Sequence, residues 1–284
     1  MEPYSHLPLD HITIVLHQPR FAENIGSTAR AAMNLGLRHI TLINPEDTDR
    51  ERMSKLATHA AAGLLESMEI KPSLSEALAP FHFIVGTTAR LGGERKQIVT
   101  PAQAGQKILA LGPDNRVALL FGPENRGLSN EELRYCHAVV NIPTVQSSSL
   151  NLAQAVLIMA YEIFLAHRIP EEGPAVQDSP RGSVDDQTLK AQRSLEEPSL
   201  ATSFELEGMY QHLSEVLQMM DFLDKQNPEH WMMSIRRFFS RIHLYSPEVR
   251  MIRGVCRQLK WFVKTQKALA KNNGCENLKD RTDA

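Results

Sequence analysis

The first 168 residues alternate short apolar runs with segments of helical spacing, and this alternation constrains the fold more than any other feature. The runs are rich in β-branched residues and end at turn signals, which is typical of buried strands. They are His11–Leu16, His39–Ile43, Phe81–Val85, Val117–Phe121 and Ala138–Ile142, with Met68–Ile70 as a short additional strand. Alternating strands and helices predict an α/β domain with a mostly parallel sheet and flanking helices.

The segments between the strands carry signals for helix starts. Ser73 and Ser129 each precede a glutamate by three residues, which is the spacing of a capping box. The last helix of the domain is predicted over Leu150–His167 and is apolar on most of its faces. A helix that is apolar all round must be buried, here either under the sheet or against another subunit.

Charge divides the chain into unlike parts. The formal net charge of −2 does not indicate that bulk charge binds nucleic acid. That total, however, is the sum of −1 over residues 1–168, −6 over residues 169–207 and +5 over residues 208–284. The partition permits a nearly neutral N-terminal domain with a basic arm.

The same partition predicts the domain organisation. Residues 169–207 contain several Pro and Gly and few large apolar side chains, so we expect an acidic flexible linker. Residues 208–271 space their apolar side chains as helices do, with breaks before Pro228 and Pro247, and predict a helical C-terminal extension. Residues 272–284 are expected to form a frayed tail.

The cysteines and the apolar stretches of the sequence indicate in which cellular compartment the protein is expected. Cys136, Cys256 and Cys275 are too few and too widely spaced for a disulfide framework or a zinc pair, so no metal site is predicted. The first residues lack the pattern of a signal peptide. The most apolar stretch, Ala153–Ala166, contains Glu162 and is shorter than the ~20 residues of a membrane span. We expect a cytoplasmic protein without membrane association.

Three segments that follow predicted strands carry candidate functional residues. After the first strand come Asn24, Gly26 and Arg30. Asn24 is able to cap the next helix, Gly26 permits close approach of a ligand or another backbone, and Arg30 lies about one turn further along. In isolation, a helix cap and a solvated arginine explain this segment somewhat better than a functional site does.

The second segment follows Phe121 and has glycines at 122 and 127. It lacks the lysine of a phosphate-binding loop, and the chain contains no G-x-G-x-x-G, which argues against a nucleotide-dependent Rossmann enzyme. Its turn is expected to bury the carboxylate of Glu124 near a strand end, although an ordinary loop is equally compatible. The third segment, Ser147–Asn151, gathers hydroxyl and backbone N–H groups at a helix start, which favours a polar or anionic ligand or simply a serine-rich cap.

Taken together and in this order, N-x-G-x-x-x-R, F-G-P-E-x-x-G-L and S-S-L-N-L resemble the three motifs of the SPOUT methyltransferases, in their TrmH-like branch of RNA 2′-O-ribose methyltransferases. The C-terminal runs at Met209, Ile235 and Ile252 are similar to the helical appendage of the bacterial TrmJ-type tRNA (cytidine/uridine-2′-O-)-methyltransferases. The resemblance implies a knotted SPOUT fold with a C-terminal trefoil knot, plus a small all-α appendage. It also implies a homodimer that completes the active site across its interface.

The resemblance assigns roles to residues of the three motifs. It implies that S-adenosylmethionine contacts Thr87, Thr88, Ala89, Gly122, Ile142, Ser148, Ser149 and Leu150. The residues implied in catalysis are Arg30, Asn24, Glu124, Ser149 and Asn151. Arg30 matches the arginine that the family assigns to activating the 2′-OH. It acts either as a base or as an orienting donor, with the proton passing to Ser149, to water or to a transiently neutral arginine.

The implied substrate is tRNA, with the pyrimidine at nucleotide 32 of the anticodon loop as the methylated residue. Another tRNA position, rRNA, or a non-catalytic RNA-binding module are the alternatives that the motifs leave open. Expected RNA contacts near the site are Arg20, Arg90, Arg95 and Lys96, and those on the appended helices are Arg236, Arg237, Arg241, Arg253 and Arg257. For the second group, solvated helix faces or dimer contacts with the acidic linker remain open alternatives.

Overall fold

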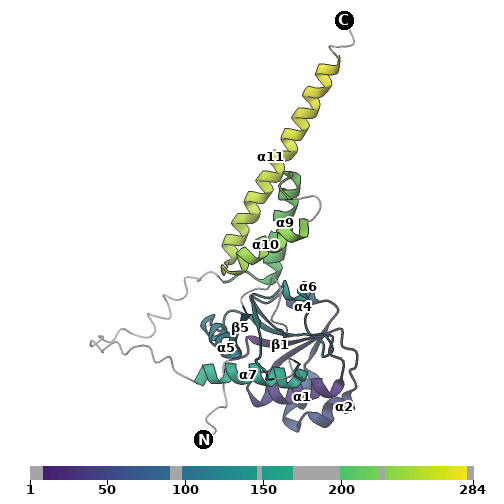
Figure 1. Ribbon diagram of the computed structural model, residues 1–284, viewed down its shortest axis with the longest axis vertical. Helices are drawn as coiled ribbons and strands as arrows, with labels where there is room; N and C mark the ends of the chain where they lie inside the picture. Colours follow the sequence, from purple (N-terminus) through teal and green to yellow (C-terminus); the bar gives the residue numbers. More distant parts are fainter. Residues whose placement is uncertain (1–8, 90–97, 146–148, 169–198, 224–227, 280–284) are drawn as a thin grey trace, which may run out of the picture. The chain divides into compact units, whose positions relative to one another are not determined.

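A computed structural model describes residues 9–89, 98–145, 149–168, 199–223 and 228–279, with side chains up to residue 266. The chain divides into two compact units, residues 1–203 and 204–284 (Figure 1). In the described part of the chain, no helix is both long and apolar enough to cross a membrane.

Unit 1 is built on a parallel sheet of seven strands in the order β3-β2-β1-β6-β4-β7-β5. The strands are β1 (Ile12–His17), β2 (His39–Ile43), β3 (Glu69–Lys71), β4 (Phe83–Thr87), β5 (Ile98–Val99), β6 (Val117–Phe121) and β7 (Ala138–Val140). The predicted parallel α/β architecture is confirmed, because the central strands β1, β6, β4 and β7 are largely buried and helices lie in the crossovers; the edge strand β3 is exposed.

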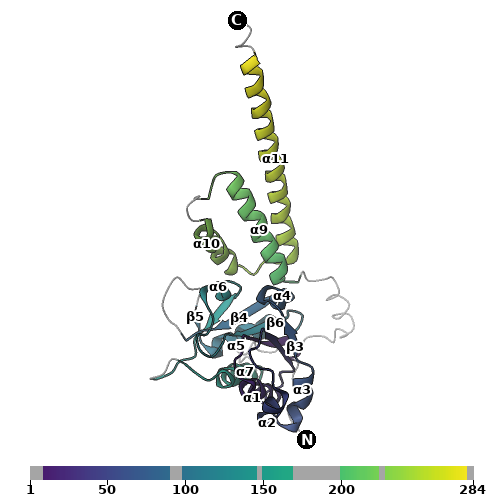
Figure 2. The ribbon, with the colours of Figure 1, turned by 90° about the vertical axis from the view of Figure 1, so that its right-hand side faces the viewer.

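Helices cover both faces of this sheet (Figure 2). One face packs against α1 (Ala22–Asn34), α2 (Arg50–Leu56), α3 (Ala62–Glu66), α5 (Pro101–Ala110) and α7 (Leu152–Arg168), with a short 3₁₀ turn at His59–Ala61. The other face packs against α4 (Leu74–Leu78) and α6 (Asn130–Leu133). Ser73 and Ser129 cap these last two helices, as their spacing predicts.

Several predicted boundaries differ from the structure. Helix α1 begins at Ala22, before Asn24, and its N-cap is Phe21, which makes no side-chain hydrogen bond there. The prediction that Asn24 caps this helix is therefore wrong, because its side chain is bonded elsewhere. Strand β4 starts at Phe83 because the backbone N–H groups of His82 and Phe83 both donate to the carbonyl of Arg116.

The sheet order carries a topological feature at one edge. β7 lies between β4 and β5, although those two strands follow each other in the chain. The backbone N–H of Thr88 donates to Val140 O at 2.9 Å, and that of Asn141 donates to Val99 O at 3.2 Å. The knot expected here stays a prediction, because residues 90–97 and 146–148 lie outside the described residues.

Helix α7 is only partly covered within unit 1. Val156, Met159 and Ile163 are fully buried against the rest of the unit. Leu157 and Tyr161 on the other side are 45% and 48% exposed. The predicted burial under the sheet thus holds for one face, and the second face remains available to a partner.

Unit 2 consists of three helices, α9 (Ser203–Met219), α10 (Pro228–Ser240) and α11 (Ser246–Lys279). Pro228 and Pro247 lie at the starts of the last two, where the sequence predicts helix starts. Two predicted boundaries are wrong: residues 203–207, expected in the linker, form the first turns of α9, and residues 272–279, expected in the tail, belong to α11. Of the other predicted linker residues, 169–198 lie outside the described residues, whereas Leu200 and Ala201 are described and buried.

Candidate functional site

A pocket of about 270 Å³ opens at the carboxyl edge of the sheet, where ligands of open α/β folds bind. Its walls come from three places: the end of β4, the loop after β6, and the segment that leads from β7 into α7. The lining residues are Thr87, Thr88, Ala89, Phe121, Gly122, Pro123, Glu124, Asn125, Arg126, Gly127, Ile142, Ser149, Leu150, Leu152 and Ala155.

The loop after β6 turns back on itself tightly. A Cβ atom on Gly122 would lie 2.4 Å from the carbonyl carbon of Gly127, which no side chain tolerates. Gly127 has φ of +67°, a conformation that favours glycine. The backbone N–H of Gly127 closes the turn by donating to Pro123 O at 2.8 Å. The spacing of the two glycines therefore reflects the shape of the pocket wall and not a phosphate cradle.

Three side chains join the three motif segments to one another. Nδ2 of Asn151 donates to Oδ1 of Asn24 at 2.8 Å. Nδ2 of Asn24 donates to Oε1 of Glu124 at 2.7 Å, and the backbone N–H of Arg20 donates to Oε2 at 3.0 Å. The start of α1, the loop after β6 and the start of α7 are thus held in one arrangement at the mouth of the pocket.

Gly26 serves packing on the other side of α1. A Cβ atom there would lie 2.1 Å from the carbonyl oxygen of Met53. Its predicted close approach is to the backbone of α2, with which α1 shares the core of unit 1. The bidentate pair between Arg52 and Glu23, at 2.8 and 2.9 Å, ties the same two helices together at the surface.

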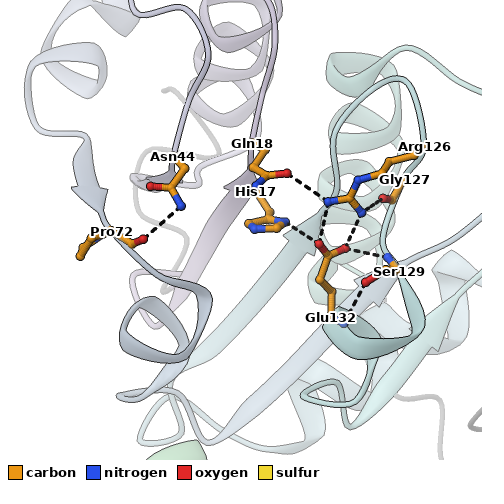
Figure 3. Close-up of polar contacts among 8 residues, drawn as sticks. All are labelled: His17, Gln18, Asn44, Pro72, Arg126, Gly127, Ser129 and Glu132. Atoms are coloured by element: carbon orange, nitrogen blue, oxygen red, sulfur yellow. Dashed lines mark hydrogen bonds and ion pairs between the residues drawn. The ribbon is translucent and has the colours of Figure 1, made fainter.

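Glu132 on α6 is the centre of a second polar cluster below the loop (Figure 3). Its two carboxylate oxygens accept from Nη1 and Nη2 of Arg126 at 2.9 and 2.8 Å, and Oε2 also accepts from the backbone N–H of Ser129 at 2.6 Å. Burial raises the pKa of Glu132, but these bonds outweigh burial, so the net pKa is lowered. Glu132 is therefore an ionised carboxylate at neutral pH.

Residues 11–161 match the SpoU rRNA Methylase family, and residues 204–272 match the C-terminal domain of the tRNA methyltransferase TrmJ. The chain is 34% identical over 264 residues to the tRNA (cytidine/uridine-2′-O-)-methyltransferase TrmJ of Escherichia coli O6:K15:H31, a match that covers 92% of this chain and 99% of that relative. The chain belongs to the TrmJ branch of the SpoU methylase family. As a member of it, the protein is a methyltransferase.

Further TrmJ relatives agree over most of their length. The TrmJ of Photorhabdus laumondii is 33% identical over 255 residues, with 89% of this chain and 98% of the relative covered. The crystal structure of TrmJ from Z. mobilis ZM4 matches with a TM-score of 0.69 and 29% identity, covering 87% of this chain and 98% of that one. Both units therefore have counterparts in TrmJ proteins.

The pocket of this TrmJ-branch methylase collects most of the residues predicted for the methyl donor. Seven of the eight line it; Ser148 lies outside the described residues. Of the predicted catalytic residues, Glu124 and Ser149 line the pocket, and Asn24 and Asn151 bond to Glu124 or to each other at its mouth. Arg30 is exposed on α1 and is not among the lining residues.

The predicted RNA contacts separate into different groups. Arg20 pairs with Glu46 at 3.1 Å, and Arg90, Arg95 and Lys96 lie outside the described residues. In the TrmJ-type extension, Arg236 forms a bidentate pair with Glu207 and lies 4.3 Å above the ring of Tyr210. Arg236 is thereby engaged inside unit 2, whereas Arg241 is exposed and Arg237 is half-buried.

Sequence reasoning missed the pair of Arg126 and Glu132 beside the pocket. The capping-box spacing of Ser129 and Glu132 was visible, and it indicated only a helix start. A signal was nevertheless present. The carboxylate of a capping glutamate is able to accept further hydrogen bonds, and Arg126, three residues before the N-cap Ser129, is close enough in sequence to donate them to Glu132. Among the described residues, no group of three His, Cys, Asp or Glu is arranged to hold a metal ion.

Proposed function

We propose that this protein transfers a methyl group from S-adenosylmethionine to a ribose 2′-OH of cytoplasmic tRNA, at the pyrimidine of position 32. The observation that carries the proposal is the pocket at which the three motif segments meet through Asn24, Glu124 and Asn151. The relatives support the reaction and the substrate class, because they are named tRNA (cytidine/uridine-2′-O-)-methyltransferases.

The walls of the pocket fit the methyl donor chemically. Ile142, Leu150, Leu152 and Ala155 offer an apolar surface to a flat base, and Thr87, Thr88 and Ser149 bring hydroxyl groups and backbone polar atoms toward a ribose or an amino acid group. The tight turn at Gly122 lets the loop backbone approach a ligand closely. When bound, S-adenosylmethionine supplies an electrophilic methyl group on a sulfonium.

The chain itself must orient the 2′-OH and favour loss of its proton. Asn24, Glu124 and Asn151 fix the pocket mouth, and all three side chains are already engaged with one another. Arg30, by contrast, makes no hydrogen bond or ion pair with any described residue. We assign to Arg30 the contact with the target ribose or its neighbouring phosphate.

Arg30 does not line the pocket of its own chain. We therefore infer that the protein acts as a homodimer. The exposed face of α7, with Leu157 and Tyr161, supplies an apolar surface for a second copy. In such a dimer, Arg30 of the partner subunit completes the pocket. The dimer thereby accounts both for an apolar helix face left uncovered and for an unpaired arginine in a catalytic motif.

Two roles for Arg30 differ in energy. The guanidinium of arginine is a hydrogen-bond donor that is effectively always protonated in proteins, which weighs against a base and favours an orienting donor. Arg30→Lys distinguishes them. Recovery of most activity at high pH supports a base, whereas a loss that pH does not relieve supports the planar, bidentate geometry of arginine.

RNA contacts are assigned to one side of α11. Arg250, Arg257 and Lys264 are exposed there and make no hydrogen bond or ion pair with any described residue. On this helix they fall within a quarter turn of Trp261, which is 64% exposed. Cations beside an exposed aromatic ring match phosphates beside an unstacked base. This face replaces Arg236 in the predicted set of contacts.

Ribose-methylation mapping of total RNA, with and without the gene, tests the proposal. The expected result is loss of one 2′-O-methyl group at a pyrimidine in position 32 of a subset of tRNAs. Loss at another tRNA position or in rRNA would overturn the assigned nucleotide but keep the reaction. No loss, together with no heat of S-adenosylmethionine binding in calorimetry, would overturn the proposed reaction.

A further inference from the structure

The loop that forms one wall of the pocket, Gly122–Gly127, is held from two sides by residues that follow β1. β1 and β6 are parallel neighbours, with Leu16 opposite Phe121, so their following loops leave the sheet side by side. On one side, Glu124 accepts from the Arg20 backbone and from Asn24. The other side of the loop is held by a different set of contacts, centred on Arg126.

Arg126 uses its guanidinium to join three segments (Figure 3). Nη2 donates to Oε1 of Gln18 at 3.0 Å, next to the end of β1. Nη1 donates to the carbonyl of Gly127 at 3.1 Å, within the loop itself. Both nitrogens also bond to Glu132 on α6, whose side chain is 12% exposed. A planar group with several fixed donors is needed to satisfy all of these acceptors at once.

Gln18 is itself fixed in an unusual backbone conformation. Its φ is +50°, in the left-handed region that residues other than glycine rarely adopt. Its backbone N–H donates to Ile43 O at 2.7 Å, and its side chain accepts from Arg126. The strained residue is thus fastened at both ends, which is common where a site needs a defined shape.

We propose that Arg126 is a positioning residue for the methyl donor. With Glu132 and Gln18 it holds the Gly122–Gly127 loop against the end of β1, in the shape that makes the pocket wall. The inference rests on the proposed function, because it assumes that this pocket binds S-adenosylmethionine. Arg126 acts through the loop and takes no part in the transfer of the methyl group.

The test measures binding of S-adenosylmethionine to the full chain by calorimetry, and methyl-transfer kinetics on tRNA. Arg126→Lys keeps the charge but cannot bridge Gln18, Gly127 and Glu132 together. We expect its dissociation constant for the donor to rise about tenfold. The KM for S-adenosylmethionine should rise in parallel, with tRNA affinity unchanged.

Arg52→Lys is the matched control. Arg52 also forms a bidentate pair with a glutamate of unit 1 and is 42% exposed, against 38% for Arg126, but it does not line the pocket. The Arg52→Lys variant should bind S-adenosylmethionine with an affinity within twofold of wild type. If both variants lower the melting temperature equally and weaken donor binding equally, the effect is general destabilisation and the inference is wrong.

Gln18→Gly separates stability from positioning. Glycine relieves the positive φ but removes the acceptor for Arg126, so the variant should unfold no more easily than wild type and still bind the donor several-fold more weakly. Unchanged donor affinity in Arg126→Lys and Gln18→Gly, with wild type binding normally, overturns this inference alone. Wild type that binds no S-adenosylmethionine overturns the proposed function, and the inference with it.

Discussion

The two units of the protein bury their side chains to very different extents. In unit 1, both faces of the sheet are covered, and most strand residues are fully buried. In unit 2, α10 has no buried residue, and α11 exposes large apolar side chains such as Met251 and Trp261. A packed sheet holds loops to a defined shape, whereas a thin helical layer mainly presents a surface.

Their cations differ in the same way. In unit 1, Arg52 and Arg126 each reach a glutamate through two hydrogen bonds. Unit 2 contains comparable pairs, Arg236 with Glu207 and Lys260 with Glu215, which join its helices. On α11, Arg250, Arg257 and Lys264 are exposed and form no such pair with any described residue. Paired cations organise a structure, and unpaired ones are available to a charged ligand.

The largest effect that would sharpen this comparison is expected at Arg30, which makes no hydrogen bond or ion pair with any described residue. Arg30→Ala should lower kcat by about 10²–10³-fold, the range for loss of one hydrogen-bond donor that stabilises developing negative charge, and leave the affinity for S-adenosylmethionine unchanged. Single-turnover assays with radiolabelled donor measure the loss. A variant with near-normal kcat would show that Arg30 is only a solvated helix residue.

Subunit mixing tests whether Arg30 acts across a dimer. Arg30→Ala and Glu124→Ala are each expected to be inactive as pure proteins. After random exchange, half of the dimers are mixed and each of these has one intact site, so about a quarter of wild-type activity should return. No recovery, with exchange demonstrated by mass, would place both residues in the site of a single chain.

The tight packing of unit 1 predicts a strong effect at Gly26. Gly26→Ala should lower the free energy of unfolding by about 1–3 kcal/mol, because its Cβ would overlap the backbone of Met53. Urea denaturation measures the change. Gly63→Ala is the matched control, since a Cβ there meets nothing within 4 Å, and it should be neutral or stabilising by up to ~1 kcal/mol.

The comparison also predicts what salt does to RNA binding. Replacing Arg250, Arg257 and Lys264 by alanine should reduce the slope of log affinity for tRNA against log salt by about 2–3, since each phosphate contact contributes about 0.7–0.9. Unit 2 should keep its helical content in circular dichroism, because the three side chains are exposed. A slope equal to that of wild type would remove this face of α11 from the RNA interface.

The sequence predicted those parts of the fold that repeat a local pattern. Runs such as Val117–Phe121 and His39–Ile43 are strands with the predicted bounds, because burial on both faces requires unbroken apolar residues. The two-residue strand β5 was missed, since Ile98–Val99 is too short to show any periodicity. The bonding of the Asn24 side chain was not predicted either, because its partners, Glu124 and Asn151, are 100 and 127 positions away in the sequence.

The candidate site was predictable to the extent that motifs carry it. Resemblance named Gly122, Ile142 and Leu150, which the fold brings to one pocket. Resemblance could not identify Arg126, because the role of that residue depends on how close Gln18, next to β1, and Glu132, on α6, lie in space. Resemblance also could not distinguish a paired arginine from an unpaired one. Arg236 on α10 bonds to Glu207 on α9, whereas Arg241 bonds to no carboxylate among the described residues.

The smallest expected effect concerns pH and the cluster below the loop. His17 is 7% exposed, with Nδ1 3.2 Å from Oε1 of Glu132. Burial lowers its pKa below the ordinary 6.5 and Arg126 lowers it further, while Glu132 opposes them. The unfolded chain therefore binds this proton more readily than the native state does.

It follows that the contribution of neutral His17 to stability is fully present above pH 6.5 and is lost as the pH falls toward the lowered native value. Glu132, with a net lowered pKa, adds a second loss below about 4.5. The free energy of unfolding measured in urea should therefore be lower at pH 5.5 than at pH 7.5. His17→Gln should reduce this difference without abolishing it, because His212 in unit 2 also has a lowered pKa. If His17→Gln shows the same pH dependence as wild type, the packed unit does not hold this histidine neutral.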